Sequence, residues 1–143
     1  MGYLDDYAEI EARRARVFFL LGRTLKIALA VLVVGGSLYL WFKNYNEEKR
    51  AEGFLTQLQG GNYPQAYSFW GCTVENPCPT YSYEDFLEDW GPAGKIGKVN
   101  SYRLGRSRAQ GTGVTVAVQI NNQEPLGLWV EKKDGVVGFA PPF

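Results

Sequence analysis

Few residues in this sequence have side chains suited to chemistry, and the two cysteines are the first of them. Cys72 and Cys78 stand six positions apart in the stretch GCTVENPCP. The sequence has no histidine, which removes the usual general base and the commonest metal ligand. The next candidates are three carboxylates, Asp85, Glu88 and Asp89, which follow the cysteines closely.

The spacing of the two cysteines favours a structural disulfide. A redox pair is typically C-x-x-C at the start of a helix, and a c-type haem site needs a histidine. Two thiols without histidine are too few for a structural zinc site. We therefore predict a bridge between Cys72 and Cys78, with free thiols as the alternative. Such a bridge adds roughly 2 kcal/mol of stability and persists outside the reducing cytosol.

The carboxylates are expected to form a solvated helix face, and no catalytic residue is predicted. They lie in SYEDFLEDW, where Ser82 and Asp85 resemble a capping box at a helix start. Glu124 falls in a turn, and no GxSxG, P-loop, GxGxxG or metal motif is present. We predict no metal, no cofactor and no small-molecule substrate. Fifteen basic and fifteen acidic residues leave no net charge to recruit nucleic acid.

Residues 24–42, TLKIALAVLVVGGSLYLWF, are predicted to form a single transmembrane helix. Every residue from 27 to 42 is apolar, glycine or serine, as a bilayer-spanning helix requires. A cleaved signal peptide is the alternative, but its basic region would be unusually long and no A-x-A-like site follows. The flanking residues are of the types that favour the membrane interface, namely Arg23, Lys26, Tyr39, Trp41 and Tyr45.

Residues 1–23 are predicted to form an amphipathic helix in which acids precede bases, as the helix dipole favours. This helix either lies on a surface or partner, or is a solvated extension of the membrane helix. Five basic residues lie between 13 and 26, against three between 43 and 50. The positive-inside rule therefore predicts a cytoplasmic N-terminus, and a disulfide on the opposite side agrees with that orientation.

Residues 43–143 have the size of one small domain, for which we predict an α+β fold. Helical patterns end at Gln59, span 63–70 with Asn62 as the expected cap, and begin again after Ser82. The period then changes to two, which predicts four strands at 98–110, 112–120, 126–133 and 136–143. Short turns between these strands indicate an antiparallel meander with helices over one face.

This order of elements, with FLTQLQGGNYPQAYSFW followed by SYEDFLEDW, resembles the cystatin-like (nuclear transport factor 2-like) superfamily. It is most similar to small bacterial membrane-anchored versions, which implies a bacterial inner membrane and a periplasmic domain. The resemblance covers roughly residues 47–140 and implies a curved sheet that forms a cone closed by the helices. It also implies a core in which helix residues meet strand residues: Phe54, Leu58, Tyr67 and Trp70 against Val116, Val118, Leu128 and Val130.

Four residues are predicted to bind a partner. Trp129 alternates opposite to the apolar residues of its strand, and Tyr102 is expected to do the same. Exposed aromatic side chains on a sheet face mark partner interfaces, the alternative being that other elements cover them. Gly35 and Gly36 form a small-residue notch where another membrane helix can approach closely.

Two functions from different classes follow from these features. The first is a non-catalytic, single-pass accessory or assembly subunit of a larger membrane protein complex, including an energy-transducing one. The second is a membrane-tethered ligand-binding or enzymatic domain that uses the cone, which requires an open pocket in place of an aromatic plug. An envelope sensor that links the domain to the N-terminal helix is a third, weaker hypothesis.

Overall fold

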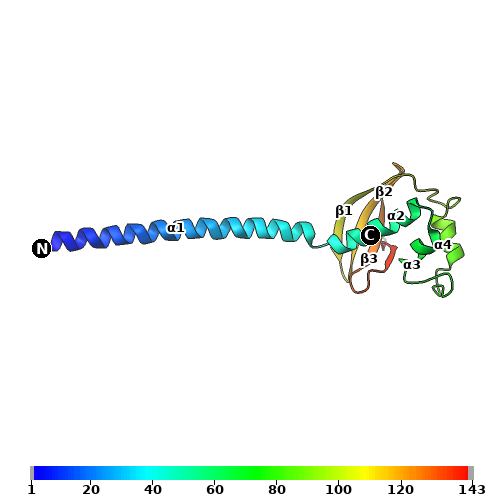
Figure 1. The fold of residues 1–143 in the computed structure, drawn as a ribbon, viewed down its shortest axis with the longest axis horizontal. Helices are drawn as coiled ribbons and strands as arrows, with labels where there is room; N and C mark the ends of the chain where they lie inside the picture. The colour runs from blue at the N-terminus through cyan, green and yellow to red at the C-terminus, as the bar shows by residue number, and fades with distance from the viewer. Residues whose placement is uncertain (1, 142–143) are drawn as a thin grey trace. The chain divides into compact units, whose positions relative to one another are not determined.

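A computed structural model describes residues 2–141, without the side chains of residues 3–5. The chain divides into two units, one up to Lys43 and one from Asn44 onward, each described here by itself. Figure 1 shows a long helix in the first unit and a mixed helix-and-sheet domain in the second. The predicted α+β class is confirmed at this level.

The first unit is one continuous helix, α1, which spans Tyr3–Phe42. The predicted segments 1–23 and 24–42 are thus parts of a single helix, with no break between them. Its apolar part is long enough to cross a membrane by length and composition. Lys43 continues the helical hydrogen bonding, since its N–H donates to the carbonyl of Tyr39 at 2.9 Å.

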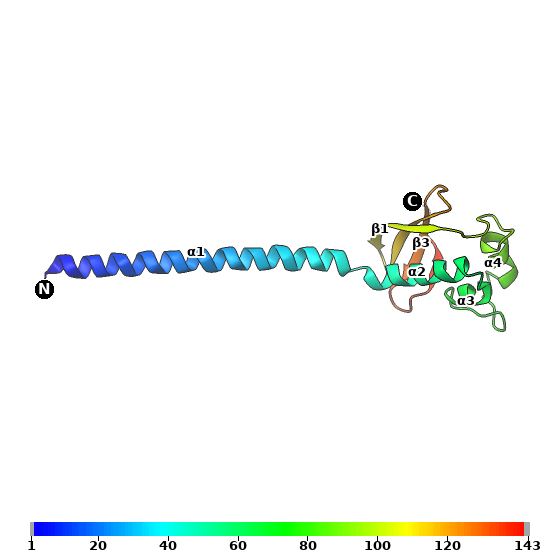
Figure 2. The same cartoon turned by 45° about the horizontal axis from the view of Figure 1, so that its top comes forward.

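The second unit begins with α2 (Tyr45–Gln59), which lies along one face of the sheet (Figure 2). Its buried residues are Ala51, Phe54, Leu55 and Leu58. This spacing of three and four residues places all of them on one side of a helix, which explains why α2 packs on the sheet. The helix ends at a turn in which Gly61 has a φ of +73°, a conformation that favours glycine.

Two short helices follow, α3 (Tyr63–Ser68) and α4 (Tyr83–Trp90). Ser82 caps α4 as predicted, because its hydroxyl accepts from the Asp85 N–H while the Asp85 carboxylate accepts from the Ser82 N–H. Asn62 occupies the N-cap position of α3 as expected, but its side chain makes no capping hydrogen bond. The Asn62 amide donates instead to the side chain of Gln57 at 3.3 Å, which takes it away from the helix start.

The sheet has four antiparallel strands in sequence order: β1 (Tyr102–Gln110), β2 (Gly113–Ile120), β3 (Leu126–Glu131) and β4 (Val137–Phe139). The predicted strands are correct in number and order, but the observed first strand starts later and the third ends earlier than predicted. The fourth strand ends at Phe139, and residues 142 and 143 of its predicted range lie outside the described residues. β1 starts at Tyr102 and not at residue 98, because the N–H groups of Asn100 and Ser101 donate to the side chain of Asn121. The side-chain oxygen of Asn121 thus takes the place of the backbone carbonyl of a neighbouring strand.

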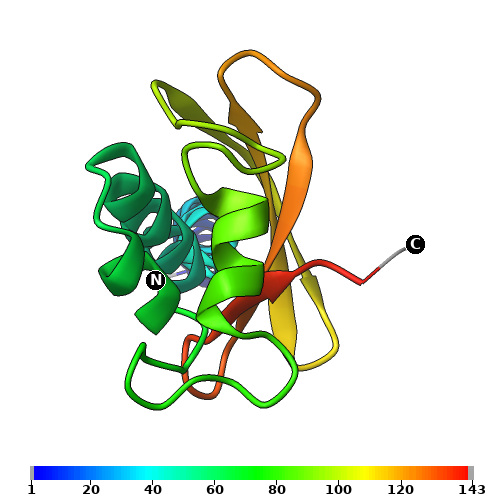
Figure 3. The same cartoon turned by 90° about the vertical axis from the view of Figure 1, so that its right-hand side faces the viewer.

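Helices α2 and α4 lie on one side of the sheet, and the hydrophobic core fills the space between the layers (Figure 3). Most of the residues expected in the core are buried there. Trp70 differs, because it is only partly buried and contacts Phe139 and Tyr81 at the edge of the core. The other expected core residues are buried: Phe54, Leu58, Tyr67, Val116, Val118, Leu128 and Val130.

Candidate partner-binding site

The surface of α1 is apolar and exposed over the part predicted to lie in a membrane. Arg23 and Phe42 are separated by 19 residues, a rise of about 28 Å along a helix, which is close to the ~30 Å of a hydrocarbon core. Arg23 and Lys26 lie at one end of this stretch, and Tyr39 and Trp41 at the other, 71% and 81% exposed. This arrangement suits a helix that crosses a bilayer between interfacial side chains.

The fifth predicted interface residue, Tyr45, belongs to the second unit. It is the first residue of α2 and is 47% exposed. It follows the last residue of α1 by three positions in the chain, and its role at the membrane interface stays a prediction.

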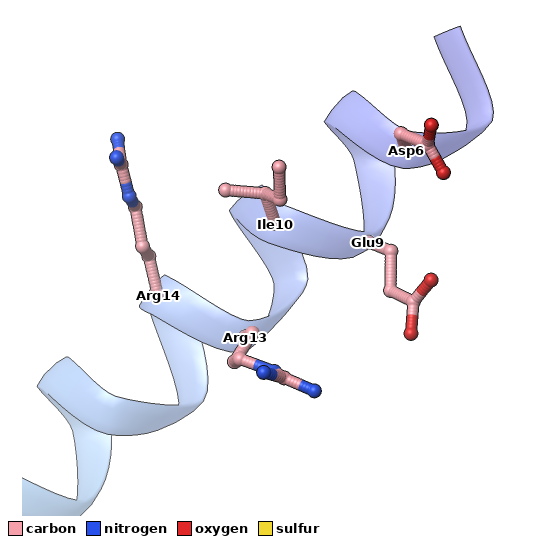
Figure 4. A pocket seen from close by; sticks show the side chains of 5 residues that line it. All are labelled: Asp6, Glu9, Ile10, Arg13 and Arg14. Atoms are coloured by element: carbon pink, nitrogen blue, oxygen red, sulfur yellow. The ribbon is translucent and has the colours of Figure 1, made fainter. Parts of the chain in front are cut away.

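The N-terminal part of α1 carries charged side chains on more than one side of the helix. Figure 4 shows Glu9 and Arg13 leaving the helix on one side, while Ile10 and Arg14 leave it on another. A helix that lies flat on a membrane needs one continuous apolar face. The arrangement is closer to a solvated helical extension than to a surface-lying helix.

The predicted notch at Gly35 and Gly36 is open. A Cβ atom built at either glycine would meet no neighbouring atom within 4 Å. Next to it, the Ser37 hydroxyl donates to the carbonyl of Val33 at 2.8 Å, so its polar group is satisfied inside the helix. The backbone of a second helix can approach closely at such a position.

Trp129 lies on the face of the sheet that the helices leave uncovered. It pairs with Thr115 of β2, and its side chain lies on the other face of the sheet from the buried residues Leu128 and Val130. Its ring covers the backbone of Gly113, where a Cβ atom would be only 2.4 Å from the ring. The tryptophan is therefore half-buried by its own sheet and still presents one side of its ring outward.

Tyr102 does not join Trp129 on the outer face, and this part of the prediction is wrong. Its ring packs against the hydrophobic core, and its hydroxyl lies 2.9 Å from the hydroxyl of Thr56 on α2. The reason is its register: Tyr102 pairs with Ile120, whose side chain is buried under the helices. Whether Tyr102, at the start of β1, contacts a partner directly stays a prediction.

Three arginines on β1 were missed by the sequence analysis. Arg103 pairs with Gln119, and Arg108 pairs with Thr115, so both lie on the outer face with Trp129. Arg103 and Arg108 are five residues apart, and regular alternation would put them on opposite faces. A β-bulge between Leu104 and Ser107 adds one residue and restores the common face.

All three side chains, Arg103, Arg106 and Arg108, are exposed. None of them forms an ion pair or a side-chain hydrogen bond with another residue in the described part of the chain. Gly105 was the signal in the sequence, because an isolated glycine inside a strand pattern marks a bulge. The bulge converts a strand with mixed polar faces into a basic outer edge of the sheet.

The two cysteines form a disulfide, with their Cα atoms 5.4 Å apart. The buried side chain of Tyr67 holds this loop to the core. Its hydroxyl donates to the carbonyl of Tyr81 at 2.6 Å and accepts from the N–H of Cys78 at 3.0 Å. The disulfide thus closes the loop, and the hydrogen bonds of the buried Tyr67 phenol hold it against the core.

Two of the four carboxylates of α4, Asp85 and Asp89, are engaged in structural contacts, while Glu84 and Glu88 are exposed to solvent. Asp89 accepts from the Tyr81 hydroxyl at 3.0 Å and pairs with Lys95 at 2.7 Å. Burial raises the pKa of the Tyr81 phenol well above its ordinary value, and the bond to Asp89 raises it further. A phenol whose pKa is raised in this way stays un-ionised near neutral pH. The Tyr81–Asp89 pair therefore stabilises the fold and is poorly suited to acid–base chemistry.

Asp85 has a pKa below its ordinary value, because the side chain and backbone of Ser82 donate hydrogen bonds to its charged form. No group of three or more cysteine, aspartate or glutamate residues with metal-binding geometry occurs among residues 2–141. The charged groups of this region thus act as helix cap and ion pair.

The chain was compared with models of protein families, with curated proteins and with solved structures, and none of them matches it. By its fold alone, the chain is an α+β domain joined to a long apolar helix.

Proposed function

We propose that this chain is a non-catalytic, single-pass accessory or assembly subunit of a larger membrane protein complex. In this proposal α1 anchors the chain and offers the notch at Gly35 and Gly36 to a neighbouring helix. The compact domain docks on the complex through its outer sheet face, where Trp129 lies. The domain is periplasmic, the N-terminus is cytoplasmic and the membrane is a bacterial inner membrane.

The filled core of the domain is the observation that carries this proposal. The rings that would line a ligand cavity contact one another instead: the Phe54 centroid lies 5.0 Å from that of Trp90 and 6.3 Å from that of Phe86. Tyr67 lies 5.3 Å from Phe86, and all four side chains are fully buried. A core packed in this way supports a binding module more than a domain that encloses a substrate.

Two further observations support the proposed location and family. The disulfide is compatible with an extracytoplasmic domain, since such bonds are rare in the reducing cytosol. A helix, α2, lies along one face of a four-stranded antiparallel sheet, which is the arrangement expected for a cystatin-like domain (Figure 3). We propose this superfamily for residues 47–140.

Blue-native electrophoresis of the tagged full chain, extracted with a mild detergent, tests the proposal. We expect a band well above the mass of the 16.0 kDa chain in its micelle, with membrane proteins that co-purify in fixed ratio. Migration as a free monomer at several detergent concentrations would contradict the accessory role. Recovery of the chain in the aqueous fraction after carbonate washing would contradict the anchor.

A pair of variants tests the notch. The double variant Gly35→Leu and Gly36→Leu fills the notch with two side chains and should weaken the complex, because close approach of helices depends on small residues. The single variant Ala30→Leu is a control for added bulk, about a third of a turn away from each glycine. Because Ala30 borders the same surface hollow as Gly35, we expect a smaller loss for this variant, not an absent one. Equal loss of the complex in both variants would show that bulk alone is responsible.

A further inference from the structure

The domain begins directly after α1, with Lys43 and Asn44 between the two helices. Three Cα–Cα steps connect Phe42 to Tyr45, which span at most about 11 Å even when fully extended. This limit holds for every orientation of the two units. Residues that are bonded to Asn44 therefore stay close to the end of α1 that carries the interfacial aromatic side chains.

Asn44 is bonded to β1 of the sheet. Its side chain is only 3% exposed, and its amide donates to the Ser107 hydroxyl at 3.0 Å. The Ser107 hydroxyl in turn donates to the carboxylate of Glu48 on the first turn of α2. Arg106 and Arg108 flank Ser107, each with its Cα atom about 3.8 Å away along the chain. Both arginines thus lie beside a residue that is bonded to Asn44, the first residue of the domain.

The turn between β3 and β4 brings two lysines to the same end of the domain. Lys132 and Lys133 lie in this turn, and the backbone N–H of Lys132 donates to the carbonyl of Thr112 in the turn after β1. The guanidinium of Arg50 on α2 donates to the carbonyl of Gly135 at 2.9 Å, which fixes the turn against the helix.

We define the basic end of the domain as Arg106, Arg108, Lys132 and Lys133. All four side chains are exposed, and none is in an ion pair among the described residues.

Acidic residues are also present at this end and keep their negative charge, but most of them are half-buried, whereas the four basic side chains are exposed. Several of the acids are also held against the domain by hydrogen bonds. Glu48 accepts from Ser107, Glu131 accepts from the Thr112 hydroxyl at 3.0 Å, and Asp134 accepts from the N–H of Val136. Glu47 is the remaining acid of the first turn of α2.

The opposite end of the domain is formed by α4 and the disulfide loop (Figure 2). It carries more acidic than basic residues, because Lys95, which pairs with Asp89, and Lys98 are its nearby lysines. Its exposed carboxylates are those of Glu75, Glu84, Asp85 and Glu88. Exposed basic side chains therefore gather near the N-terminus of α2, whereas exposed acidic side chains gather around α4.

From these contacts we propose that the basic end of the domain binds anionic lipid headgroups at the membrane surface. The inference rests on the proposed anchor, because the anchor brings the basic end to the headgroup layer. Lysine and arginine side chains close to an anionic surface each favour its binding by about fivefold, an effect that salt screens. Acids at the far end are held away from the same negative surface.

The test uses the full chain in lipid nanodiscs, with hydrogen–deuterium exchange as the readout. Discs of phosphatidylcholine alone are compared with discs that contain about one-third phosphatidylglycerol. We expect slower exchange in residues 103–112 and 130–136 in the anionic discs only, and loss of this protection in about 1 M salt. Equal exchange in both discs, or protection that salt does not reduce, would overturn the proposal.

A matched pair of variants assigns the effect to the basic end. The double variant Arg106→Gln and Arg108→Gln should lose most of the lipid-dependent protection, since it removes two of the four charges. The double variant Lys95→Gln and Lys98→Gln removes the same charge elsewhere in the domain and should keep it. Equal loss in both would show a net-charge effect and overturn the proposal.

Thermal unfolding of each variant separates a loss of lipid binding from a loss of fold. The comparison of the wild-type chain in the two kinds of disc tests the proposal even if a variant fails to fold. A chain that does not insert into discs would overturn both this inference and the proposed anchor. A chain that inserts but exchanges equally in both lipids would overturn this inference alone.

Discussion

The phenol of Tyr67 allows a sharp test of how the disulfide loop is held. Tyr67→Phe keeps the buried ring and removes only the hydroxyl, which bonds the carbonyl of Tyr81 and the N–H of Cys78. Each ordinary hydrogen bond contributes about 1 kcal/mol net, and its loss leaves a partner without a bond. Since Tyr81 and Cys78 are only partly buried, water can replace some of what is lost. We expect the free energy of unfolding to fall by about 2 kcal/mol.

Urea unfolding of the full chain in mild detergent, followed by tryptophan fluorescence, measures this change. The slope with urea should be unchanged, because the variant exposes the same surface on unfolding. Tyr83→Phe is the matched control: its ring lies 5.3 Å from that of Tyr67, and its hydroxyl makes no hydrogen bond within the described residues. A loss below about 0.5 kcal/mol for Tyr67→Phe, or equal losses in both variants, would refute the reasoning.

Three further predictions concern the bridge, the helix cap and the outer sheet face. Replacing both cysteines with serine should cost about 2 kcal/mol in urea unfolding, the loop-entropy value for so short a loop, and an unchanged midpoint would contradict it. The lowered pKa of Asp85 gives stability that is present above the unfolded-state pKa and is lost as the pH falls through the folded one. Asp85→Asn should thus flatten the acid side of the stability curve below about pH 4, and an unaltered curve would count against the Ser82 cap. Gly113→Ala drives a methyl group into the Trp129 ring and should cost about 1–3 kcal/mol by thermal unfolding, whereas Gly138→Ala, with no atom nearer than 3.9 Å, should cost less.

The parts of this fold that could be predicted from the sequence are those with strong local signals. Strict alternation from Val114 to Ile120 fixes a strand and its buried face, and the structure has both. The pair Ser82 and Asp85 specifies a helix start through two reciprocal hydrogen bonds. Cysteines six positions apart and bracketed by glycine and proline are compatible with a small closed loop, which is present.

The parts that could not be predicted depend on contacts between distant residues. Asparagine is a good capping residue, but the side-chain amide of Asn62 donates to the side chain of Gln57 and makes no capping hydrogen bond. Asn121 ends the first strand early by accepting from two backbone N–H groups at Asn100 and Ser101, some 20 positions away. The side on which Tyr102 lies follows from its pairing with Ile120, which no pattern within β1 reveals.

A single extra residue in β1 determines what the domain presents at its basic end. Without the bulge, the alternation that puts Leu104 under the helices would put Arg106 and Arg108 there as well. Two guanidinium groups in that layer would need buried partners, at a cost of several kcal/mol each. With the bulge, Ser107 takes the inward position and binds Asn44, while both arginines are released to the surface. The same irregularity therefore fixes the first residue of the domain to the sheet and exposes the charges beside it.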